Sequence, residues 1–173
     1  MNFTEVLNPR TIVTHLNAAG KAEALDAMSQ MFLEAGVIRD KTEFIKAVYV
    51  REEIGETGIG NYIAIPHGKS EAVITPGVAI AILDHEIEWE SLDDTGAKVV
   101  ILFAVGADNA AAQEHLKLLA LFSKRLGDET VVSKLIGADT VDDVIRAFTQ
   151  ETVSETAAEA EEAELDLDEI SII

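Results

Sequence analysis

The sequence predicts a single α/β (α+β) domain, in which a mixed β-sheet is flanked by helices on both sides. Two observations predict this class. Helical and strand-like segments are mixed along the 173 residues, without the strict βαβ alternation of a fully parallel sheet. The segment KVVILFAV at 98–105 is rich in β-branched residues, which is typical of a buried central strand. Apolar residues make up 48% of the chain, enough for one sizeable core.

The first third of the chain predicts one short strand followed by two helices. Residues 11–14, TIVT, fit the strand. Asn17 is expected to cap the first helix, whose apolar residues recur at helical spacing until Gly36 ends it. The second helix is expected to begin near Asp40 and to end at Gly55.

The middle of the chain predicts the sheet. Residues 61–65, NYIAI, form a short apolar run, and residues 77–83, GVAIAIL, form another. Together with residues 98–105 they give three expected strands after the two helices. Helical spacing then returns at residues 110–126, and Gly127 is expected to close that helix.

Two shorter helices are expected to complete the domain. Asp128 is a suitable cap for a helix that continues to Ile136. Thr140 opens the last helix, with Asp143 at the third position of a capping box. The predicted domain therefore covers residues 1–150.

The composition changes after Gln150. Residues 151–173 hold nine acidic residues and no Lys, Arg, Gly, Pro or aromatic residue. Ala and Glu favour at most a weak helix, so we interpret this segment as a disordered or weakly helical acidic linker or tail. The whole chain has a net charge of −19, which argues against binding to nucleic acid or to anionic lipid surfaces.

The chain has no cysteine, which excludes disulfides, thiolate metal sites and covalent catalysis by cysteine. No apolar run approaches the roughly 20 residues that span a bilayer. The N-terminal segment MNFTEVLNPRTIV lacks the basic flank and apolar stretch of a signal peptide. These features predict a cytoplasmic protein that does not insert into a membrane.

The four histidines differ in context. His15 and His85 lie in polar surroundings and are expected at the surface. No two histidines have the i,i+4 spacing of a metal-binding helix, so we expect neither a metal nor a cofactor. His115 precedes a set of apolar residues at helical spacing, which places it on or beside the core-facing stripe. From the residues alone, it is either a hydrogen-bonded core histidine or a functional one.

His67 is the strongest candidate for chemistry. Pro66 fixes its own backbone and favours an extended residue before it, so the preceding strand ends at a defined place. Gly68 is expected to leave room beside the imidazole for a partner or an anion, with backbone N–H groups nearby. A nucleophilic imidazole needs this fixed orientation and open access. The alternative is a histidine with a purely structural place in a turn.

The residues around His67 do not form a nucleotide-binding loop. Gly68–Lys69–Ser70 has the end of a P-loop motif, but Ile63 occupies the position where the first glycine is required. Arg51, sixteen residues before His67, lies on the apolar face of the second predicted helix. It is either a residue of the rim or a ligand for phosphate. Glu52 beside it is expected to be solvated.

Arg51 and Glu52, the motif TGIGNYIAIPHG at 57–68, and the helix HLKLLALFSKRL at 115–126 together resemble one family. They are similar to the IIA domain of the bacterial phosphoenolpyruvate-dependent sugar phosphotransferase system, fructose/mannitol class. The resemblance covers about residues 3–149. The segment IEWESLDD at 87–94 resembles the fructose branch.

The resemblance implies a phosphotransferase. Family members accept a phosphoryl group from the phosphocarrier protein HPr on the histidine of the PHG motif, here His67. They pass it to a cysteine of a IIB domain, and the membrane domain IIC carries the sugar while it is phosphorylated. His115 matches the second histidine of the family's site and Arg51 matches its arginine. Backbone N–H groups around Gly68 are expected to stabilise the phosphoryl oxygens.

Two further expectations concern partners. The surface that receives a partner is expected to be apolar, with Tyr62, Ile63 and Ile65 near His67. The family commonly has glycine where this chain has Tyr62, which is a departure from the pattern. Regulatory relatives of the nitrogen branch share the PHG motif. A IIA protein that controls other proteins through its phosphorylation state is therefore the alternative function.

Overall fold

The computed structural model describes residues 2–150. The expected linker or tail at 151–173 lies outside the described residues. Six strands form one sheet, in the order β1-β5-β6-β3-β2, with β4 also pairing with β6. The strands are β1 (Ile12–Leu16), β2 (Gly58–Gly60), β3 (Ile63–Ala64), β4 (His67–Lys69), β5 (Gly77–Ile87) and β6 (Ala97–Val105).

Both parallel and antiparallel pairs occur in this sheet, which confirms the predicted mixed sheet. β5 runs antiparallel to β6 and parallel to β1. β3 and β4 both run parallel to β6, and β2 runs antiparallel to β3. β6 therefore lies at the centre and supports the short strand that begins with His67.

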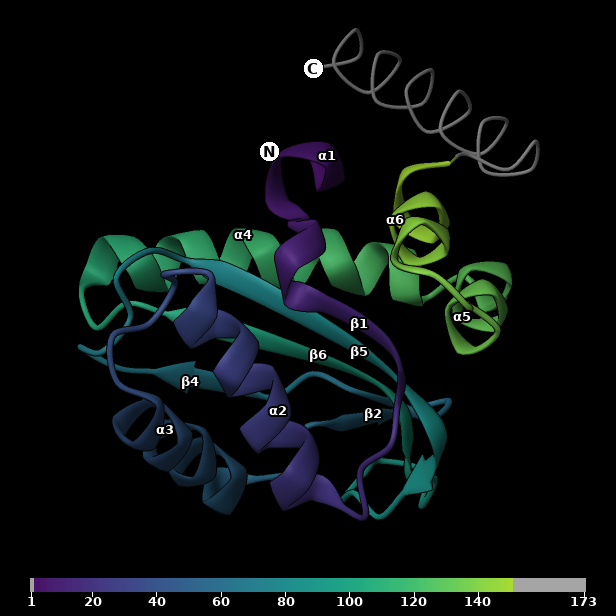
Figure 1. The fold of residues 1–173 in the computed structure, drawn as a ribbon, viewed down its shortest axis with the longest axis horizontal. Helices are drawn as coiled ribbons and strands as arrows, with labels where there is room; N and C mark the ends of the chain where they lie inside the picture. Colours follow the sequence, from purple (N-terminus) through teal and green to yellow (C-terminus); the bar gives the residue numbers. More distant parts are fainter. Residues whose placement is uncertain (1, 151–173) are drawn as a thin grey trace, which may run out of the picture.

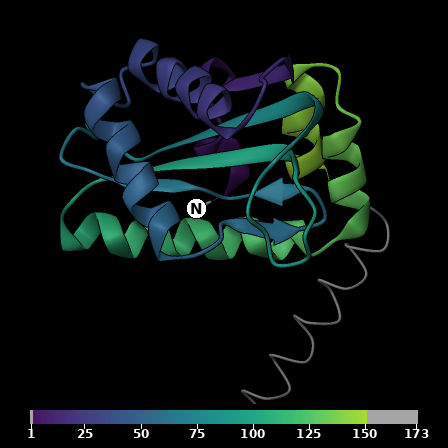
Figure 2. The ribbon, with the colours of Figure 1, turned by 90° about the horizontal axis from the view of Figure 1, so that it is seen from below.

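Helices cover both faces of the sheet (Figure 1 and Figure 2). α2 and α3 pack on one face, whereas α4 lies along the other, together with α1, α5 and α6. The helices are α1 (Phe3–Val6), the 3-10 helix η1 (Pro9–Thr11), α2 (Lys21–Glu34), α3 (Lys41–Ile54), α4 (Asn109–Leu126), α5 (Glu129–Ile136) and α6 (Val141–Thr149).

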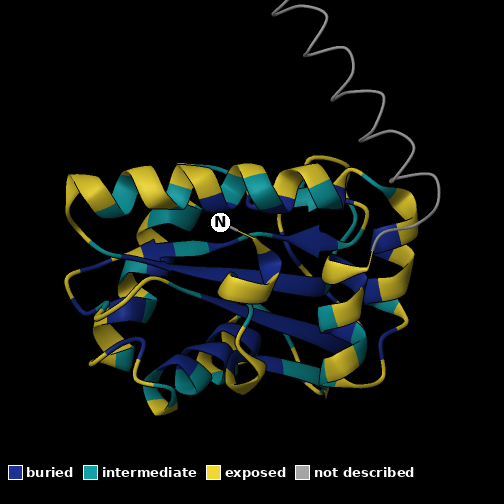
Figure 3. Cartoon of the chain, turned by 90° about the horizontal axis from the view of Figure 1, so that it is seen from above, coloured by how far each residue is buried: buried dark blue, intermediate teal, exposed yellow. Residues whose placement is uncertain are grey.

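The two central strands explain why both faces are covered. Successive side chains of a strand point to opposite faces, and nearly every residue of β6 is buried (Figure 3). Ile80, Ile101 and Phe103 belong to the hydrophobic cluster on the α4 side. Ala79 and Ala81 belong to the cluster on the α2 and α3 side, where small residues let the helices approach the sheet closely.

Most expected helix boundaries are confirmed. Asp40 caps α3 by accepting a hydrogen bond from the Glu43 backbone N–H at 2.9 Å, and Gly55 follows the helix. Thr140 and Asp143 form the expected capping box of α6. Within residues 2–150, no helix is both long enough and apolar enough to cross a membrane.

The expected cap at Asn17 is wrong. The first residue before α2 is Gly20, whose extended backbone makes no side-chain capping bond. Instead, the side chain of Glu23 in the first turn accepts a hydrogen bond from the Ala19 backbone at 2.6 Å. The cap of this helix therefore lies three residues later than expected, and Ala18 in the intervening segment is buried.

The expected strand at 61–65 is confirmed only at Ile63–Ala64, which form β3. Asn61 and Tyr62 form a turn with φ values of 56° and 67°, between β2 and β3. Oxygens of Asp93 and Thr95 hold this turn by accepting hydrogen bonds from its two backbone N–H groups. Left-handed backbone favours glycine, which explains physically why a glycine suits the position of Tyr62. Pro66 lies between β3 and β4. The end of the strand before Pro66 was expected, whereas the strand β4 after it was not.

Candidate functional site

His67 is the first residue of β4, directly after Pro66. It pairs in register with Phe103 on the central strand β6, so the sheet fixes its backbone. The imidazole ring lies 4.8 Å from the ring of His115, centroid to centroid, at an angle of 45°. The sheet therefore brings together two histidines that are 48 residues apart in the sequence.

The environment of His67 favours its neutral form. Burial lowers the pKa of His67 below its ordinary value, and the positive charge of Arg51 lowers it further. The Ile65 backbone and the Glu52 carboxylate act in the opposite sense and raise this pKa, but the net effect is a lowered pKa. Nδ1 is buried and has no hydrogen-bond partner among the described residues, which leaves Nε2 as the nitrogen accessible to a reaction partner.

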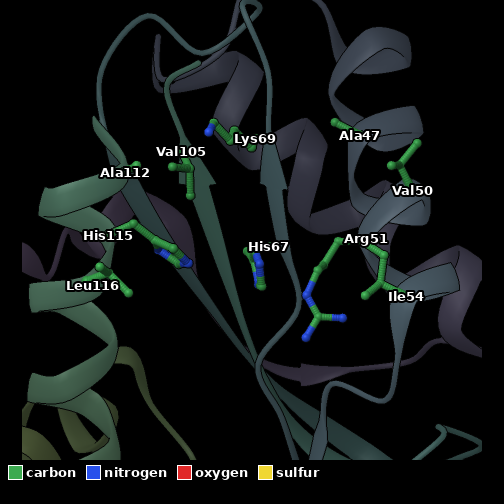
Figure 4. A pocket seen from close by; sticks show the side chains of 10 residues that line it. All are labelled: Ala47, Val50, Arg51, Ile54, His67, Lys69, Val105, Ala112, His115 and Leu116. Atoms are coloured by element: carbon green, nitrogen blue, oxygen red, sulfur yellow. The ribbon is translucent and has the colours of Figure 1, made fainter. Parts of the chain in front are cut away.

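His115 projects from α4 toward His67 (Figure 4). Its ring also contacts Phe103, with 5.4 Å between the ring centroids. Burial, and then the neighbouring His67, lower the pKa of His115 to about 4. Within residues 2–150, both of its ring nitrogens are buried and neither has a hydrogen-bond partner, which contradicts the alternative of a hydrogen-bonded core histidine.

Arg51 approaches His67 from the opposite side to His115 (Figure 4). It lies in the last turn of α3, and its Nη1 donates a hydrogen bond to the backbone carbonyl of Gly55 at 2.9 Å. The guanidinium is half-buried and keeps other N–H groups available as donors. The structure therefore brings all three expected side chains, His67, His115 and Arg51, into one site.

These side chains open into a cavity of about 590 Å³. Apart from the three expected residues and Lys69, its lining is apolar: Ala47, Val50, Ile54, Val105, Ala112 and Leu116. Val50, Ile54 and Leu116 are 61%, 78% and 66% exposed, so apolar side chains also face solvent beside the cavity. None of the three apolar residues expected near His67 lines this cavity. Ile63 is buried in the sheet and Tyr62 lies in the turn between β2 and β3, whereas Ile65 does lie beside His67, whose pKa its backbone raises.

Gly68 has a different steric role from the expected one. A Cβ at this position would lie 2.8 Å from Cε1 of Phe44 and 2.9 Å from Cγ2 of Val48. The space that the glycine leaves open is therefore filled by α3, rather than by a partner or an anion. Close packing of β4 against α3 requires glycine here, and this packing sets how near α3 lies to His67.

The sequence reasoning missed Lys69 and misjudged Glu52. Lys69 lines the cavity, and its position two residues after His67 in a strand was the signal that could have found it. Glu52 is not solvated, since its side chain is only 6% exposed and binds Lys21 and Thr57. His15 and His85 are exposed, as expected, and do not line the cavity.

Comparison with known proteins identifies the family of this chain. Residues 5–151 match the model of the family described as phosphoenolpyruvate-dependent sugar phosphotransferase system, EIIA 2. A fructose-specific EIIA component of Haloferax volcanii is 35% identical over 130 residues, which cover 73% of this chain and 83% of that protein. A nitrogen regulatory protein of Escherichia coli is 29% identical over 150 residues, which cover 86% of this chain and 90% of the relative.

Other relatives are much longer than this chain. A fructose-specific EIIABC component of Bacillus subtilis is 33% identical over 150 residues, which cover 87% of this chain but only 23% of the relative. The similarity to a mannosylglycerate-specific EIIABC component of Escherichia coli likewise spans 22% of that protein.

Solved structures have the same fold. The IIA mannitol protein of Escherichia coli superposes with a TM-score of 0.71 at 26% identity, covering 83% of this chain and 99% of that one. The nitrogen regulatory protein IIA-Ntr of Neisseria meningitidis has a TM-score of 0.75 at 19% identity, covering 84% and 97%. With the family model matched over residues 5–151, the chain belongs to the EIIA 2 family of the phosphoenolpyruvate-dependent sugar phosphotransferase system.

Proposed function

We propose that this protein carries a phosphoryl group on His67, accepting it from HPr and passing it to a IIB domain for the uptake and phosphorylation of a fructose-like sugar. The observation that supports this most is the arrangement of Arg51 and His115 on opposite sides of His67, at an open cavity with apolar walls. Transfer of this kind joins two cytoplasmic carriers, so we place the protein in the cytoplasm. The membrane domain IIC would be reached only through IIB.

The proposed reaction uses the lone pair on Nε2 of His67. This nitrogen attacks the phosphorus of the donor's phosphohistidine, the donor P–N bond breaks, and the electron pair leaves with the donor imidazole. In the second step the thiolate of the IIB cysteine attacks the same phosphorus, and Nε2 leaves. The lowered pKa of His67 supports this role, because a neutral ring is the nucleophile.

The neighbouring groups would stabilise charge on the phosphoryl oxygens. Phosphoryl transfer passes through a loose transition state, so positioning and electrostatics supply most of the catalysis. Arg51 is a permanent cation beside His67, and Lys69 adds a second positive charge to the cavity wall. A neutral His115 donates one N–H, and its unpartnered nitrogens are consistent with a bond made only to the phosphoryl group. The backbone N–H groups around Gly68 remain candidate donors.

Docking of the two carriers would use the apolar rim, formed by Val50 and Ile54 on α3 and Leu116 on α4. Carriers must bind and dissociate quickly, which fits a modest apolar interface around a charged centre. A solved complex of the IIA and phosphorylated IIB mannitol enzymes of Escherichia coli superposes on this chain with a TM-score of 0.71. The net charge of −19 makes nucleic acid an unsuitable partner.

The test is phosphorylation with phosphoenolpyruvate, enzyme I and HPr, followed by mass spectrometry of the labelled histidine. We expect His67→Ala to abolish labelling, because no other imidazole occupies the attacking position. His115→Ala should still accept phosphate but transfer it poorly to IIB. His85→Ala, at an exposed histidine far from the cavity lining, is the matched control and should label normally. Labelling of another histidine in His67→Ala would overturn the assignment.

A regulatory role is the second candidate function. The similarity to a nitrogen regulatory protein of Escherichia coli over 86% of this chain favours it. The same preparation distinguishes the two functions. A transport component should pass its phosphoryl group to a fructose- or mannitol-type IIB domain within the assay, whereas a regulatory protein should keep it.

A further inference from the structure

A buried carboxylate next to Arg51 in the sequence acts electrostatically on His67. Glu52 follows Arg51 in the last turn of α3, and its side chain is only 6% exposed. Its Oε2 accepts a hydrogen bond from Lys21 Nζ at 2.7 Å, and its Oε1 accepts one from the Thr57 hydroxyl. A buried carboxylate is costly unless it is paired and hydrogen-bonded, so both bonds are needed to hold it there.

The partners of Glu52 are themselves fixed. Lys21 also binds Glu90 at 2.6 Å, and its ammonium lies 4.7 Å from the centroid of the Trp89 ring. Trp89 Nε1 donates a hydrogen bond to Oγ1 of Thr57 at 2.9 Å, which closes the network. Burial lowers the pKa of Lys21, but Glu52 and Glu90 together raise it above its ordinary value. The start of α2, the end of α3 and the chain after β5 are thereby joined.

This network reaches Arg51 through a short loop. Arg51 donates a hydrogen bond to the carbonyl of Gly55, which lies between the end of α3 and Thr57. Glu52 ties the helix to Thr57 across the same loop. The position of the Gly55 carbonyl, and with it the direction of the Arg51 guanidinium, therefore depends on the Glu52 bonds.

We propose that Glu52 is a positioning residue for phosphoryl transfer, which holds the end of α3 and the Gly55 carbonyl so that Arg51 points toward the phosphoryl group on His67. This inference rests on the proposed function of His67. Small displacements matter in such a site, because an error of about 1 Å in placing a catalytic group costs on the order of a hundredfold in rate.

Glu52 also balances charge at His67. The charged and titratable groups around the imidazole are Arg51 and Glu52 from α3, His115 from α4, and Lys69 from its own strand. Arg51 lowers the pKa of His67, whereas Glu52 raises it. Loss of the Glu52 charge should therefore lower the pKa of His67 further, a change that a purely structural role for Glu52 would not produce.

The experiment compares Glu52→Gln with Glu53→Gln. Both variants remove one negative charge from the same turn of α3, but Glu53 is exposed. We expect Glu52→Gln to reduce kcat for transfer from phosphorylated HPr by about tenfold or more, with a smaller change in KM. NMR titration should show a lower pKa for His67 in Glu52→Gln only. A folded Glu52→Gln with the kcat and His67 pKa of the Glu53→Gln control would overturn the proposal.

A second pair of variants decides the matter if Glu52→Gln does not fold. Thr57→Val removes the hydroxyl that binds Glu52 while keeping the shape and the charge of the site. It should lower kcat, and Thr57→Ser, which restores the hydroxyl, should recover most of the lost rate. Equal kcat values for Thr57→Val and Thr57→Ser would overturn the proposal. Failure of the wild-type protein to accept phosphate on His67 would instead contradict the proposed function.

Discussion

At the scale of single residues, the site contains polar groups whose burial lowers the free energy of unfolding. His115 has two buried nitrogens without partners, and burial holds its pKa at about 4. An unsatisfied buried polar atom costs about 1–3 kcal/mol. Such a cost is expected where a group is kept ready for a ligand rather than for the fold.

We therefore expect His115→Leu to stabilise the protein while it impairs phosphoryl transfer. Leucine fills much of the same space and leaves no unpaired nitrogen, so the free energy of unfolding in urea should rise by about 1 kcal/mol. His85→Leu, at an exposed position, should change it by less than about 0.5 kcal/mol. A loss of stability in His115→Leu would show that the imidazole nitrogens are satisfied after all.

The same residue predicts a dependence of stability on pH. The pKa of His115 is about 4 in the folded protein against an ordinary value of 6.5 in the unfolded chain, so the unfolded chain binds more protons between these values. The free energy of unfolding should therefore fall as the pH is lowered through this window. The half-buried ring limits the loss to on the order of 1 kcal/mol.

This loss is measured as the difference between wild type and His115→Leu in urea titrations at several pH values. The difference removes the contribution of the carboxylates, which both proteins share. The stability advantage of the variant should grow toward pH 4. An advantage that stays constant with pH would contradict the lowered pKa.

At the scale of elements, the contact between β4 and α3 sets the geometry of the site. Gly68 of β4 lies so close to Phe44 and Val48 of α3 that a Cβ would approach both within 3.0 Å. Phe44 and Val48 are fully buried, so neither can move away cheaply. The helix that carries Arg51 is thus held against the strand that carries His67.

Gly68→Ala should force α3 away from β4. We expect a loss of about 1–3 kcal/mol in the free energy of unfolding, as for other overpacked cores, together with slower phosphoryl transfer. Gly127→Ala is a matched control, because a Cβ there makes only ordinary contacts at 3.6 Å. Unfolding in urea measures the first effect and labelling by phosphorylated HPr the second. Wild-type stability in Gly68→Ala would show that α3 is not confined by this contact.

A second element, the turn at Asn61 and Tyr62, has left-handed backbone strain, because both residues have positive φ and neither is glycine. Its left-handed backbone is held by Asp93, whose pKa falls to about 2, chiefly through the Thr95 side chain. Lys98 lies 4.6 Å from the centroid of the Tyr62 ring, a cation–π contact that offsets part of the cost of the tyrosine. Tyr62 therefore belongs to the support of β3 and not to the lining of the cavity.

At the scale of the whole molecule, the net charge of −19 should steer a partner with basic residues around its own site. We expect the second-order rate of phosphoryl transfer from HPr to fall about tenfold between low salt and 0.5 M salt, since exposed charges are screened beyond about 10 Å at 0.1 M. Stopped-flow measurements of the transfer rate at several salt concentrations test this expectation. The rate at saturating HPr should change much less, because steering acts on association. A rate independent of salt would contradict steering.

Local patterns in the sequence were sufficient for most of the helices and for the mixed sheet, and they singled out His67. They left His115 and Arg51 with a structural alternative each. Capping residues such as Asp40 and Thr140, and the β-branched run at 98–105, specify their elements through contacts with near neighbours in the chain. His67 was marked by its own flanking residues, Pro66 and Gly68. Such features depend on a few adjacent residues, so they can be predicted without the fold.

The tertiary structure alone decided what depends on residues far apart in the chain. The short strand β4 pairs with the long strand β6, and β2 pairs with β3 and bridges Ser91; local propensity does not reveal these partners. The role of Glu52 depends on Lys21, thirty-one residues away, and the reason for Gly68 depends on packing against α3. The sequence by itself determined the class of fold and the candidate site residues His67, His115 and Arg51. Only the folded sheet and helices decided how they are held together, because burial and pairing are properties of contacts rather than of composition.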